Sequence, residues 1–395
     1  MLNLLKKNNG AIFLLMLNVF LAFIGMGLVI PVMPTFMNMF GLSGTIVGLL
    51  VAAFAFSEFL FSPFAGRWAD CYGRKKIIVF GLILFSISEL IFGLASETLF
   101  LFIGRLLGGI GAGLIMPAVM AYVVDITTEK ERGIGMGWIS AAISTGFIIG
   151  PAIGGYLVTW GVRVPFFAAA VAALIAAVVT SFVLPESLGK EQQIENQKIS
   201  YDNQLKELII SYRTPYFIGL MVILVASLGI AQYETVLGLF VDKKLAFTAQ
   251  DIATMIMIGS IVGAIVQFTL FGLLVNKLGE KKLAIYALLS SGLFMLVSIT
   301  FTNFWLLVIA VAIIFTSFDL VRPAISTFFS KIAGNEQGYV AGLNSAYTSL
   351  GYILGPILAG ILFDIHLNIP FIFGSLIMFC GCLVLVTGRR GNQIK

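Results

Sequence analysis

Twelve long apolar runs constrain the fold of this chain more than any other feature of its 395 residues. Each run has about 18 residues or more, close to the roughly 20 residues that an α-helix needs to cross a bilayer. The runs lie near residues 11–30, 44–66, 77–96, 99–121, 134–159, 164–184, 215–239, 250–276, 282–301, 304–329, 338–362 and 369–388. The sequence therefore predicts an all-α polytopic membrane protein, with a six-helix bundle in residues 1–184, a linker in 185–214 and a second six-helix bundle in 215–395.

The composition excludes soluble and catalytic classes of protein. Apolar residues make up 59% of the chain and charged residues 11%, against about 25% charged residues in soluble domains. The cysteines, Cys71, Cys380 and Cys382, and the single histidine, His366, do not have the spacing of a disulfide framework or a metal site. No G-x-x-x-x-G-K-[ST] loop for ATP is present, and no nucleophile, histidine base and cofactor loop can be assembled. We therefore expect a protein that is not an enzyme, has no cofactor or metal and does not bind nucleic acid.

The basic residues of the predicted loops fall mainly on one side of the membrane. An even number of spans puts both termini on the same side, which carries 19 Lys and Arg residues, whereas the opposite side has only Arg163, Lys243 and Lys244. Cytoplasmic loops are enriched in Lys and Arg. This bias predicts a multi-pass protein of the cell membrane, with both termini and the linker in the cytoplasm.

The two halves of the chain repeat each other at an offset of 205 or 206 residues. The pairs at 205 are Gly146 with Gly351, Gly150 with Gly355, Pro151 with Pro356 and Gly155 with Gly360, and the pairs at 206 are Gly66 with Gly272, Gly73 with Gly279, Lys75 with Lys281, Lys76 with Lys282 and Pro117 with Pro323. Duplicated bundles typically place a substrate site at their interface near the middle of the membrane, with access that alternates between the two sides. The repeat therefore predicts a carrier that works by alternating access.

A short motif follows the second run, in which residues 66–76 read Gly-Arg-Trp-Ala-Asp-Cys-Tyr-Gly-Arg-Lys-Lys. The order of Gly66, Asp70, Gly73 and Arg74 resembles the signature loop of the major facilitator superfamily. Glycines permit a tight turn, Asp70 can accept hydrogen bonds from a helix N-terminus, and Arg74 can pair with Asp125 at the end of the fourth run. We expect a latch that closes the cytoplasmic side, and the alternative is a solvated loop that only follows the charge bias.

A weaker copy of this motif lies at residues 272–282. It has Asn276 in place of the aspartate and Glu280 in place of the arginine. Because these charges depart from the motif, the latch function is assigned to the first copy only.

The fifth run carries a second motif. Gly146, Gly150, Pro151, Gly154 and Gly155 follow the pattern G-x-x-x-G-P-x-x-G-G, which resembles the motif of exporters, the drug/proton antiporters, within that superfamily. Glycines four residues apart let helices approach closely, and the proline removes one helical hydrogen bond. Generic packing of small residues is the alternative. The whole chain looks similar to the twelve-helix branch of these antiporters, which includes staphylococcal quinolone exporters and Bacillus multidrug transporters.

Four acidic and two basic residues lie in the interior of the apolar runs, away from their ends. They are Glu58, Glu89, Glu234, Asp319, Arg105 and Arg322. Four carboxyls cannot all pair with two guanidinium groups, and an unpaired charge in hydrocarbon is unfavourable. At least two of the carboxyls must therefore be protonated, hydrated or bound to a cation. A carboxyl that exchanges a proton with each side in turn is the minimum requirement of a proton-driven carrier.

Glu234 and Asp319 are the preferred proton-coupling residues. Glu234 follows the polar Gln232 and Tyr233, and Arg322 lies three residues after Asp319 on the same helical face. In the resembled antiporters, acids at the matching positions are taken as the coupling site. A static pair between Asp319 and Arg322 is the alternative.

The other charged residues of the runs have competing interpretations. Serines flank Glu58 and Glu89, which indicates packed polar contacts rather than a functional role. Arg105 begins a glycine-rich stretch that resembles the superfamily's R-x-x-x-G-x-x-x-G element, and this resemblance implies a place in the proton path. An anchor from Arg105 to the carbonyls of the first run is the alternative.

The 35 phenylalanines mostly face lipid or pack within the bundles. We expect a few aromatic side chains near the acids to form a pliable wall that stacks flat cations. The residues predicted to bind substrate are Tyr233, Glu234, Phe240, Phe318, Asp319, Asn344 and Phe36.

Together these patterns favour a proton-coupled multidrug efflux transporter that exports amphipathic, often cationic compounds, such as quinolones and dyes, by alternating access. We expect a monomer in the lipid bilayer, with protons as the coupling ion. The alternatives are a proton-coupled exporter of a narrow physiological substrate (a sugar, polyamine or metabolite), a transport-inactive sensor, and a proton-coupled importer. The acids within the spans argue against the sensor, and the motif of the fifth run argues against the importer.

Overall fold

The computed structural model describes residues 10–196, 211–333 and 336–387. In this part of the chain all regular structure is helical, and twelve segments are long and apolar enough to cross a membrane. The predicted fold class, an all-α polytopic membrane protein with twelve spans, is confirmed.

The first six spans end at the short helix α9. The elements are α2 (Ala11–Val29), η2 (Ile30–Val32), α3 (Met33–Phe40), α4 (Gly44–Tyr72), α5 (Arg74–Leu94), α6 (Thr98–Ile126), α7 (Glu129–Leu157), η3 (Val158–Trp160), α8 (Val164–Val183) and α9 (Lys190–Asn196). The first span is longer than its predicted run at 11–30. It continues through a 3₁₀ turn at Pro31 into α3, because a proline at the start of a helical turn redirects the chain without ending it.

The remaining six spans follow the 3₁₀ turn η4 (Ser211–Arg213). They are α11 (Phe217–Leu245), α12 (Ala249–Leu278), α13 (Glu280–Ser298), α14 (Phe304–Ile332), α15 (Gln337–Ile365) and α16 (Ile369–Thr387).

Contacts within the chain divide it into two compact units. The first unit comprises Met1–Phe40 and Ala53–Tyr201, and the second comprises Gly41–Ala52 and Asp202–Lys395. The start of α4 thus groups with the second unit, although the sequence assigned it to the first bundle. The reason is Asp364 of α15, whose carboxylate accepts hydrogen bonds from the backbone N–H groups of Gly44 (2.6 Å) and Thr45 (2.8 Å). A carboxylate there satisfies free N–H groups at the helix N-terminus and interacts favourably with the helix dipole.

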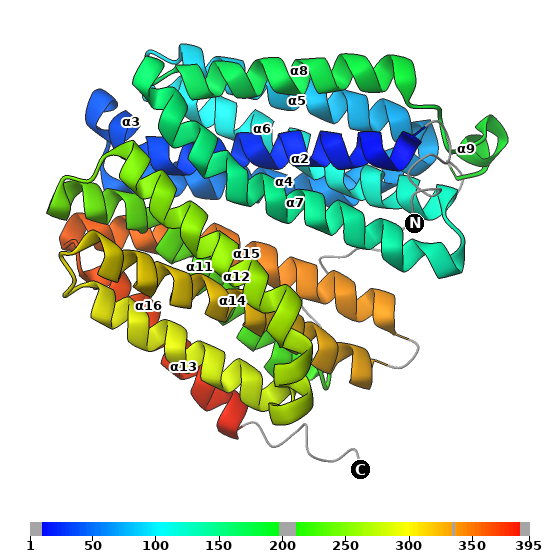
Figure 1. Cartoon of the computed structure of the whole chain (residues 1–395). Helices are drawn as coiled ribbons and strands as arrows, with labels where there is room; N and C mark the ends of the chain where they lie inside the picture. The colour runs from blue at the N-terminus through cyan, green and yellow to red at the C-terminus, as the bar shows by residue number, and fades with distance from the viewer. Residues whose placement is uncertain (1–9, 197–210, 334–335, 388–395) are drawn as a thin grey trace. The chain divides into compact units, whose positions relative to one another are not determined.

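The same pattern of helix pairs occurs in both units. In the first unit, α2 packs against α7 and α8, and α5 packs against α6 and α8, as long rods lying alongside one another (Figure 1). In the second unit, α11 packs against α15 and α16, and α13 packs against α14 and α16. The repeat read from the sequence is therefore also a structural repeat.

The glycine motif of the fifth run packs α7 against α2. A methyl group on Gly146 would lie 2.8 Å from the carbonyl oxygen of Phe20, and one on Gly150 would lie 2.7 Å from that of Ile24. Gly154 makes the same kind of backbone contact one turn further on. Only residues without a side chain allow two helix backbones to touch in this way.

The second copy of the motif packs α15 against α11. A methyl group on Gly355 would lie 2.5 Å from the carbonyl oxygen of Leu228. Pro151 and Pro356, the prolines of the two copies, lie inside α7 and α15. Both units therefore use the motif to bring one pair of helices into backbone contact.

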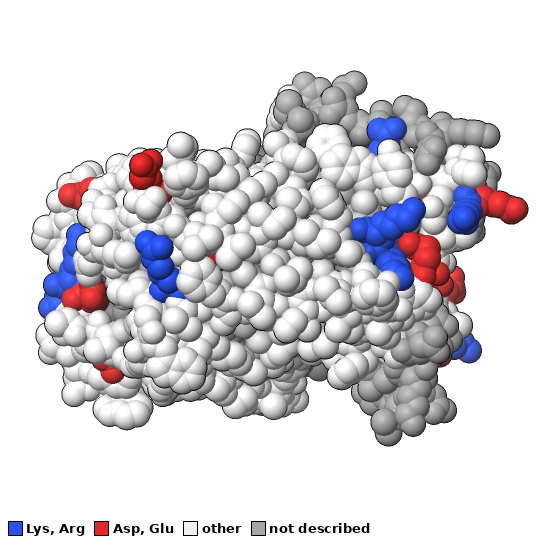
Figure 2. Space-filling view, turned by 90° about the horizontal axis from the view of Figure 1, so that it is seen from above, with Lys and Arg blue, Asp and Glu red and all other residues white. Residues whose placement is uncertain are grey.

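Charged side chains gather near the ends of the helices. On the face shown in Figure 2, blue and red residues lie at the two ends, and a broad band of other residues separates them. Large apolar side chains such as Phe182 and Phe268 are exposed along the helices. This distribution is typical of a surface that lies in a lipid bilayer.

Candidate functional site

Two of the four predicted membrane acids lie in the second unit, within electrostatic range of each other. Glu234 lies in α11 and Asp319 in α14, and both are near the middle of helices of 29 residues, which are about 43 Å long. The charge of Asp319 acts on Glu234, and the charge of Arg322, one turn after Asp319, acts on both acids. The structure therefore brings together the two acids that the sequence favoured.

These three side chains have no direct partner. In the described ranges, none of Glu234, Asp319 and Arg322 forms a hydrogen bond or an ion pair. The static pair between Asp319 and Arg322, the alternative from the sequence, is therefore not present. Arg322 is exposed, whereas both acids are half-buried. The carboxylate of Asp319 lies against Gly263 of α12, where any larger side chain would overlap it.

This arrangement can bind protons or an organic cation reversibly. Two neighbouring carboxylates repel each other, and one guanidinium neutralises only one of them. Because neither acid is engaged in a hydrogen bond, no existing contact has to break before a proton or a cation binds. The pair therefore has the chemistry of an exchange site rather than of a structural bridge.

The aromatic residues predicted for the substrate wall lie in bundle interiors. Tyr233 and Phe240 of α11 are buried and both pack against Phe371 of α16, at ring-centroid distances of 5.7 and 4.5 Å. Phe318 is also buried. Phe36 lies in the first unit, where it packs against three other phenylalanines. Within the second unit, Tyr233 and Phe240 thus share a contact with Phe371, and the role of all four aromatic side chains in substrate binding stays a prediction.

Asn344 of α15 lies near a polar residue that the sequence did not single out. Its Nδ2 is 3.5 Å from Oγ of Ser326 on α14, and its Oδ1 has no hydrogen-bond partner among the described residues. Ser326 is seven residues after Asp319, so the two lie on the same face of α14. This seven-residue spacing is visible in the sequence and could have indicated that Ser326 lies near the acid.

The motif after the second run forms a charge cluster, but it is mostly not a loop. Helix α4 continues to Tyr72, and the turn consists of Gly73 alone, with φ +104°. A side chain would be strained at this backbone conformation. Arg74, the first residue of α5, forms ion pairs with Asp70 and with Asp125, the latter at 3.2 Å. The pairing of Arg74 with Asp125 expected from the sequence is present, and the role of the cluster as a latch stays a prediction.

Two residues of the predicted linker also join this cluster. Glu186 accepts a hydrogen bond from the backbone N–H of Arg74 at 2.8 Å, and the hydroxyl of Ser187 donates to Asp125 at 2.8 Å. The sequence analysis missed both residues. The sequence could have pointed to them, because an acidic residue and a hydroxyl directly follow the sixth span, where the chain returns to the side of the membrane that carries the motif.

The weaker copy of the motif makes the equivalent bridge with reversed charges. Glu280, the first residue of α13, pairs with Lys331 near the end of α14 at 2.5 Å. These positions lie 206 residues after Arg74 and Asp125, respectively. The copy was not assigned a latch function because its charges differ, yet the reversal at both partners preserves the ion pair.

The other three membrane charges lie in the first unit. Arg105 of α6 makes no hydrogen bond to any described residue, so the proposed anchor to the carbonyls of α2 is not present. Its guanidinium carbon lies 4.2 Å from the ring centroid of Phe92. Glu89 is buried near Arg105, and Glu58 is half-buried on α4. The role of Arg105 in proton coupling stays a prediction.

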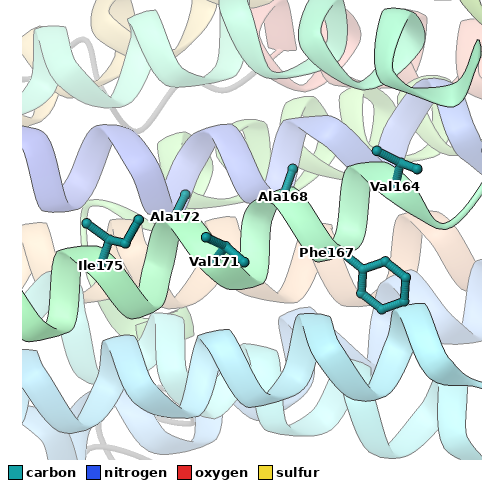
Figure 3. Close-up of a pocket in the computed structure, with 6 residues that line it drawn as sticks. All are labelled: Val164, Phe167, Ala168, Val171, Ala172 and Ile175. Carbon is teal, nitrogen blue, oxygen red and sulfur yellow. The ribbon is translucent and has the colours of Figure 1, made fainter. Parts of the chain in front are cut away.

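A shallow hollow on α8 is not a candidate for the substrate site. Figure 3 shows the side chains that line it, and all of them are apolar: Val164, Phe167, Ala168, Val171, Ala172 and Ile175. A hollow lined by one apolar helix, without a polar group to orient a ligand, is the expected surface of a helix that faces lipid.

Comparison with known proteins identifies the family. The sequence model of the family named Major Facilitator Superfamily matches residues 15–271 and 243–393 of this chain. The chain belongs to the major facilitator superfamily. Multidrug resistance protein 2 of Bacillus subtilis (strain 168) is 50% identical over 385 residues, which cover 97% of this chain and 96% of that protein. Quinolone resistance protein NorA of Staphylococcus aureus (strain MSSA476) is 36% identical over 383 residues, 97% of each chain. The predicted resemblance is confirmed, and the chain is a transporter rather than an enzyme.

Solved structures of the superfamily have the same fold. The nucleoside transporter NupG matches with a TM-score of 0.78 at 14% identity, covering 98% of this chain and 100% of that chain. The human organic anion transporter MFSD10 (TETRAN) matches with a TM-score of 0.69 at 20% identity, covering 95% of this chain and 98% of that chain. At these identities the likeness concerns the superfamily fold alone.

Proposed function

We propose that this superfamily member is a drug/proton antiporter that exports amphipathic, often cationic compounds, quinolones and dyes among them, by alternating access. The observation that carries the proposal is the pair of unpartnered acids at mid-span, Glu234 and Asp319, beside Arg322. The names of two relatives, multidrug resistance protein 2 and quinolone resistance protein NorA, support drugs as substrates.

In the proposed mechanism, a proton and a drug cation compete for the same carboxylates. A cation binds when at least one acid is ionised, and protonation of that acid removes the charge that holds the cation. The drug then leaves on the outer side, and the proton leaves on the inner side after the access changes. Arg322 disfavours two cations in the site at once, since its own charge already neutralises one carboxylate.

The proton gradient supplies enough energy for this exchange. Moving one charge through a membrane potential of 100 mV is worth about 2.3 kcal/mol. For a substrate without net charge, one proton entering at a potential of roughly 150 mV supplies about 3.5 kcal/mol, which sustains a substrate gradient of several hundredfold. For a monovalent cation the one-for-one exchange moves no net charge, so the pH difference alone drives it, at about 1.4 kcal/mol per pH unit.

The proposal also places the transporter in the cell membrane as a monomer, with both termini in the cytoplasm. The orientation is supported by the 19 basic residues on the side of the termini against three on the other. A monomer is supported by the presence of both repeated units in one chain, because such repeats form the transport pathway together.

The test is ethidium movement in proteoliposomes under an imposed pH gradient. The native chain is compared with Glu234→Gln and Asp319→Asn, which keep side-chain shape but remove the charge. Glu97→Gln is the matched control, because Glu97 is exposed at the start of α6. We expect gradient-dependent accumulation for the native chain and the control, and its loss in both substitutions of the site.

Two other outcomes would contradict parts of the proposal. Gradient-driven movement that survives both substitutions would show that coupling depends on other residues, with Glu58, Glu89 and Arg105 the next to test. No movement of any dye by the native protein would favour an exporter of a narrow physiological substrate.

A further inference from the structure

Glu89 is a buried acid that the proposed exchange site does not use. It lies in α5 of the first unit with 2% of its surface exposed. Five residues separate it from the end of α5 at Leu94, a distance of about 7 Å along the helix. The charge distribution predicts that this end faces the cell exterior.

The serines beside Glu89 do not donate hydrogen bonds to it. The hydroxyl of Ser86 donates to the carbonyl oxygen of Ala170 at 2.7 Å, and that of Ser88 donates to the carbonyl oxygen of Phe85 at 2.8 Å. Oε2 of Glu89 is buried without a partner in the described part of the chain. The packed polar contacts expected from the flanking serines are therefore absent, and an ionised Glu89 would be unsatisfied in this conformation.

The nearest opposite charge is Arg105 of α6, which is 7% exposed. Its guanidinium rests on Phe92, and its Nε and Nη2 are buried without a partner among the described residues. Phe92 is fixed by Phe36 and Phe166, at centroid distances of 5.4 and 4.8 Å. Glu89 and Arg105 act on each other electrostatically but do not form an ion pair in this structure.

Other charges are remote from Glu89. Helices α8 and α2, which also pack against α5, contain no ionisable residue in Val164–Val183 or Ala11–Val29. The backbone of Glu58 on α4 lies against Gly113 of α6, two turns and about 12 Å beyond Arg105 along that helix. Arg163, directly before α8, is engaged at the outer end of α5, where its Nη2 donates to the carbonyl oxygen of Ala95 at 2.8 Å, six residues after Glu89. Arg105 is thus the charged side chain of the described helices that acts electrostatically on Glu89.

We propose that Glu89 is a second proton-exchange group, located in the first unit, and that Arg105 is its counter-ion. With the carboxyl protonated, the guanidinium stacks on Phe92 as in this structure. When the carboxyl O–H bond breaks, the proton passes to water at the outer end of α5, and the carboxylate and guanidinium close into a direct ion pair. Arg105 keeps its charge in both states. The use of this proton in transport rests on the proposed antiport, whereas the protonation itself does not.

The test of protonation is infrared difference spectroscopy of the purified protein in lipid between low and high pH. The readout is the carbonyl stretch of protonated carboxyls, measured for the native chain, Glu89→Gln and Glu58→Gln. Glutamine keeps the shape of the side chain, and a thermal melt establishes that each variant is folded. We expect Glu89→Gln to remove a component of the pH-dependent signal that Glu58→Gln leaves in place. A Glu89→Gln spectrum identical to that of the native chain would overturn the proposal.

The test of its transport role is the number of protons moved per drug in proteoliposomes. We expect this ratio to fall by one in Glu89→Gln while drug binding is retained. An unchanged ratio would overturn the role of this proton in transport. Because the infrared measurement needs no gradient and no substrate, it is readable even if the antiport proposal fails.

Discussion

The contact between α2 and α7 provides a sharp test, because it depends on glycines. Replacing Gly146 by alanine adds one methyl group at a point where two backbones meet. That methyl carbon would lie 2.8 Å from the carbonyl oxygen of Phe20, 2.9 Å from Cβ of Phe23 and 3.2 Å from the backbone nitrogen of Ile24. Two of these three atoms belong to the backbone of α2, so they cannot rotate away.

The geometry sets the size of the effect. The distance to the oxygen is about 0.6 Å less than the 3.4 Å at which ordinary contact begins, so the helices must separate by a similar amount. Overpacking of this kind costs about 1–3 kcal/mol. Alanine is also the better helix former by about 1 kcal/mol. We therefore expect Gly146→Ala to lower the free energy of unfolding by up to about 2 kcal/mol, and by about 1–3 kcal/mol relative to a Gly→Ala change on the same helix that adds no clash.

Gly137→Ala on the same helix is the matched control. Gly137 is exposed, and no atom lies within 4 Å of the position its methyl group would take. This variant gains the helix propensity without a clash, so it should be as stable as the native chain or up to about 1 kcal/mol more stable. The assay is the thermal midpoint of each purified variant in detergent. If Gly146→Ala were at least as stable as Gly137→Ala, the backbone contact between α7 and α2 would be refuted.

Three further predictions concern the ends of the helices. Reversing either charge of the Glu280–Lys331 pair, in which Lys331 is exposed and Glu280 half-buried, should reduce dye efflux, and exchanging both should restore it. Efflux that stays low in the double variant would contradict a role for the pair itself, which we expect to contribute about 1 kcal/mol or less to stability. Glu186→Gln should lower the thermal midpoint, because it weakens the carboxylate cap on the N-terminus of α5, which is worth about 0.5–2 kcal/mol. The control is Glu191→Gln on α9, which is exposed and should leave the thermal midpoint unchanged. Asp364→Ala should speed amide hydrogen exchange in the first turn of α4, measured by mass spectrometry; unchanged exchange would show that this cap does not hold α4.

The sequence by itself determined the twelve spans, the twofold repeat and the set of charges inside the membrane. Each of these depends on local composition or on spacing along the chain, since a helix must be apolar over about 20 residues to cross lipid. It also predicted the partnership of Arg74 and Asp125, because the motif after the second run and the end of the fourth run lie on the same side of the membrane.

Only the tertiary structure decided which side of each helix faces protein and which faces lipid. Lipid is as apolar as a bundle interior, so these helices are apolar all round and have no polar face that marks the buried side. For this reason the sequence did not show that Tyr233 and Phe240 point into an aromatic core around Phe371.

Tertiary structure also decided where each hydroxyl and carboxylate finds its partner. The serines beside Glu89 donate to carbonyl oxygens, and Glu186 crosses from the end of α8 to the start of α5. Such choices depend on distances between helices that are far apart in the sequence, and residue spacing along one helix does not specify them. The sequence specifies which charges lie within the membrane spans, and the packing of the helices decides which of them remain unpaired.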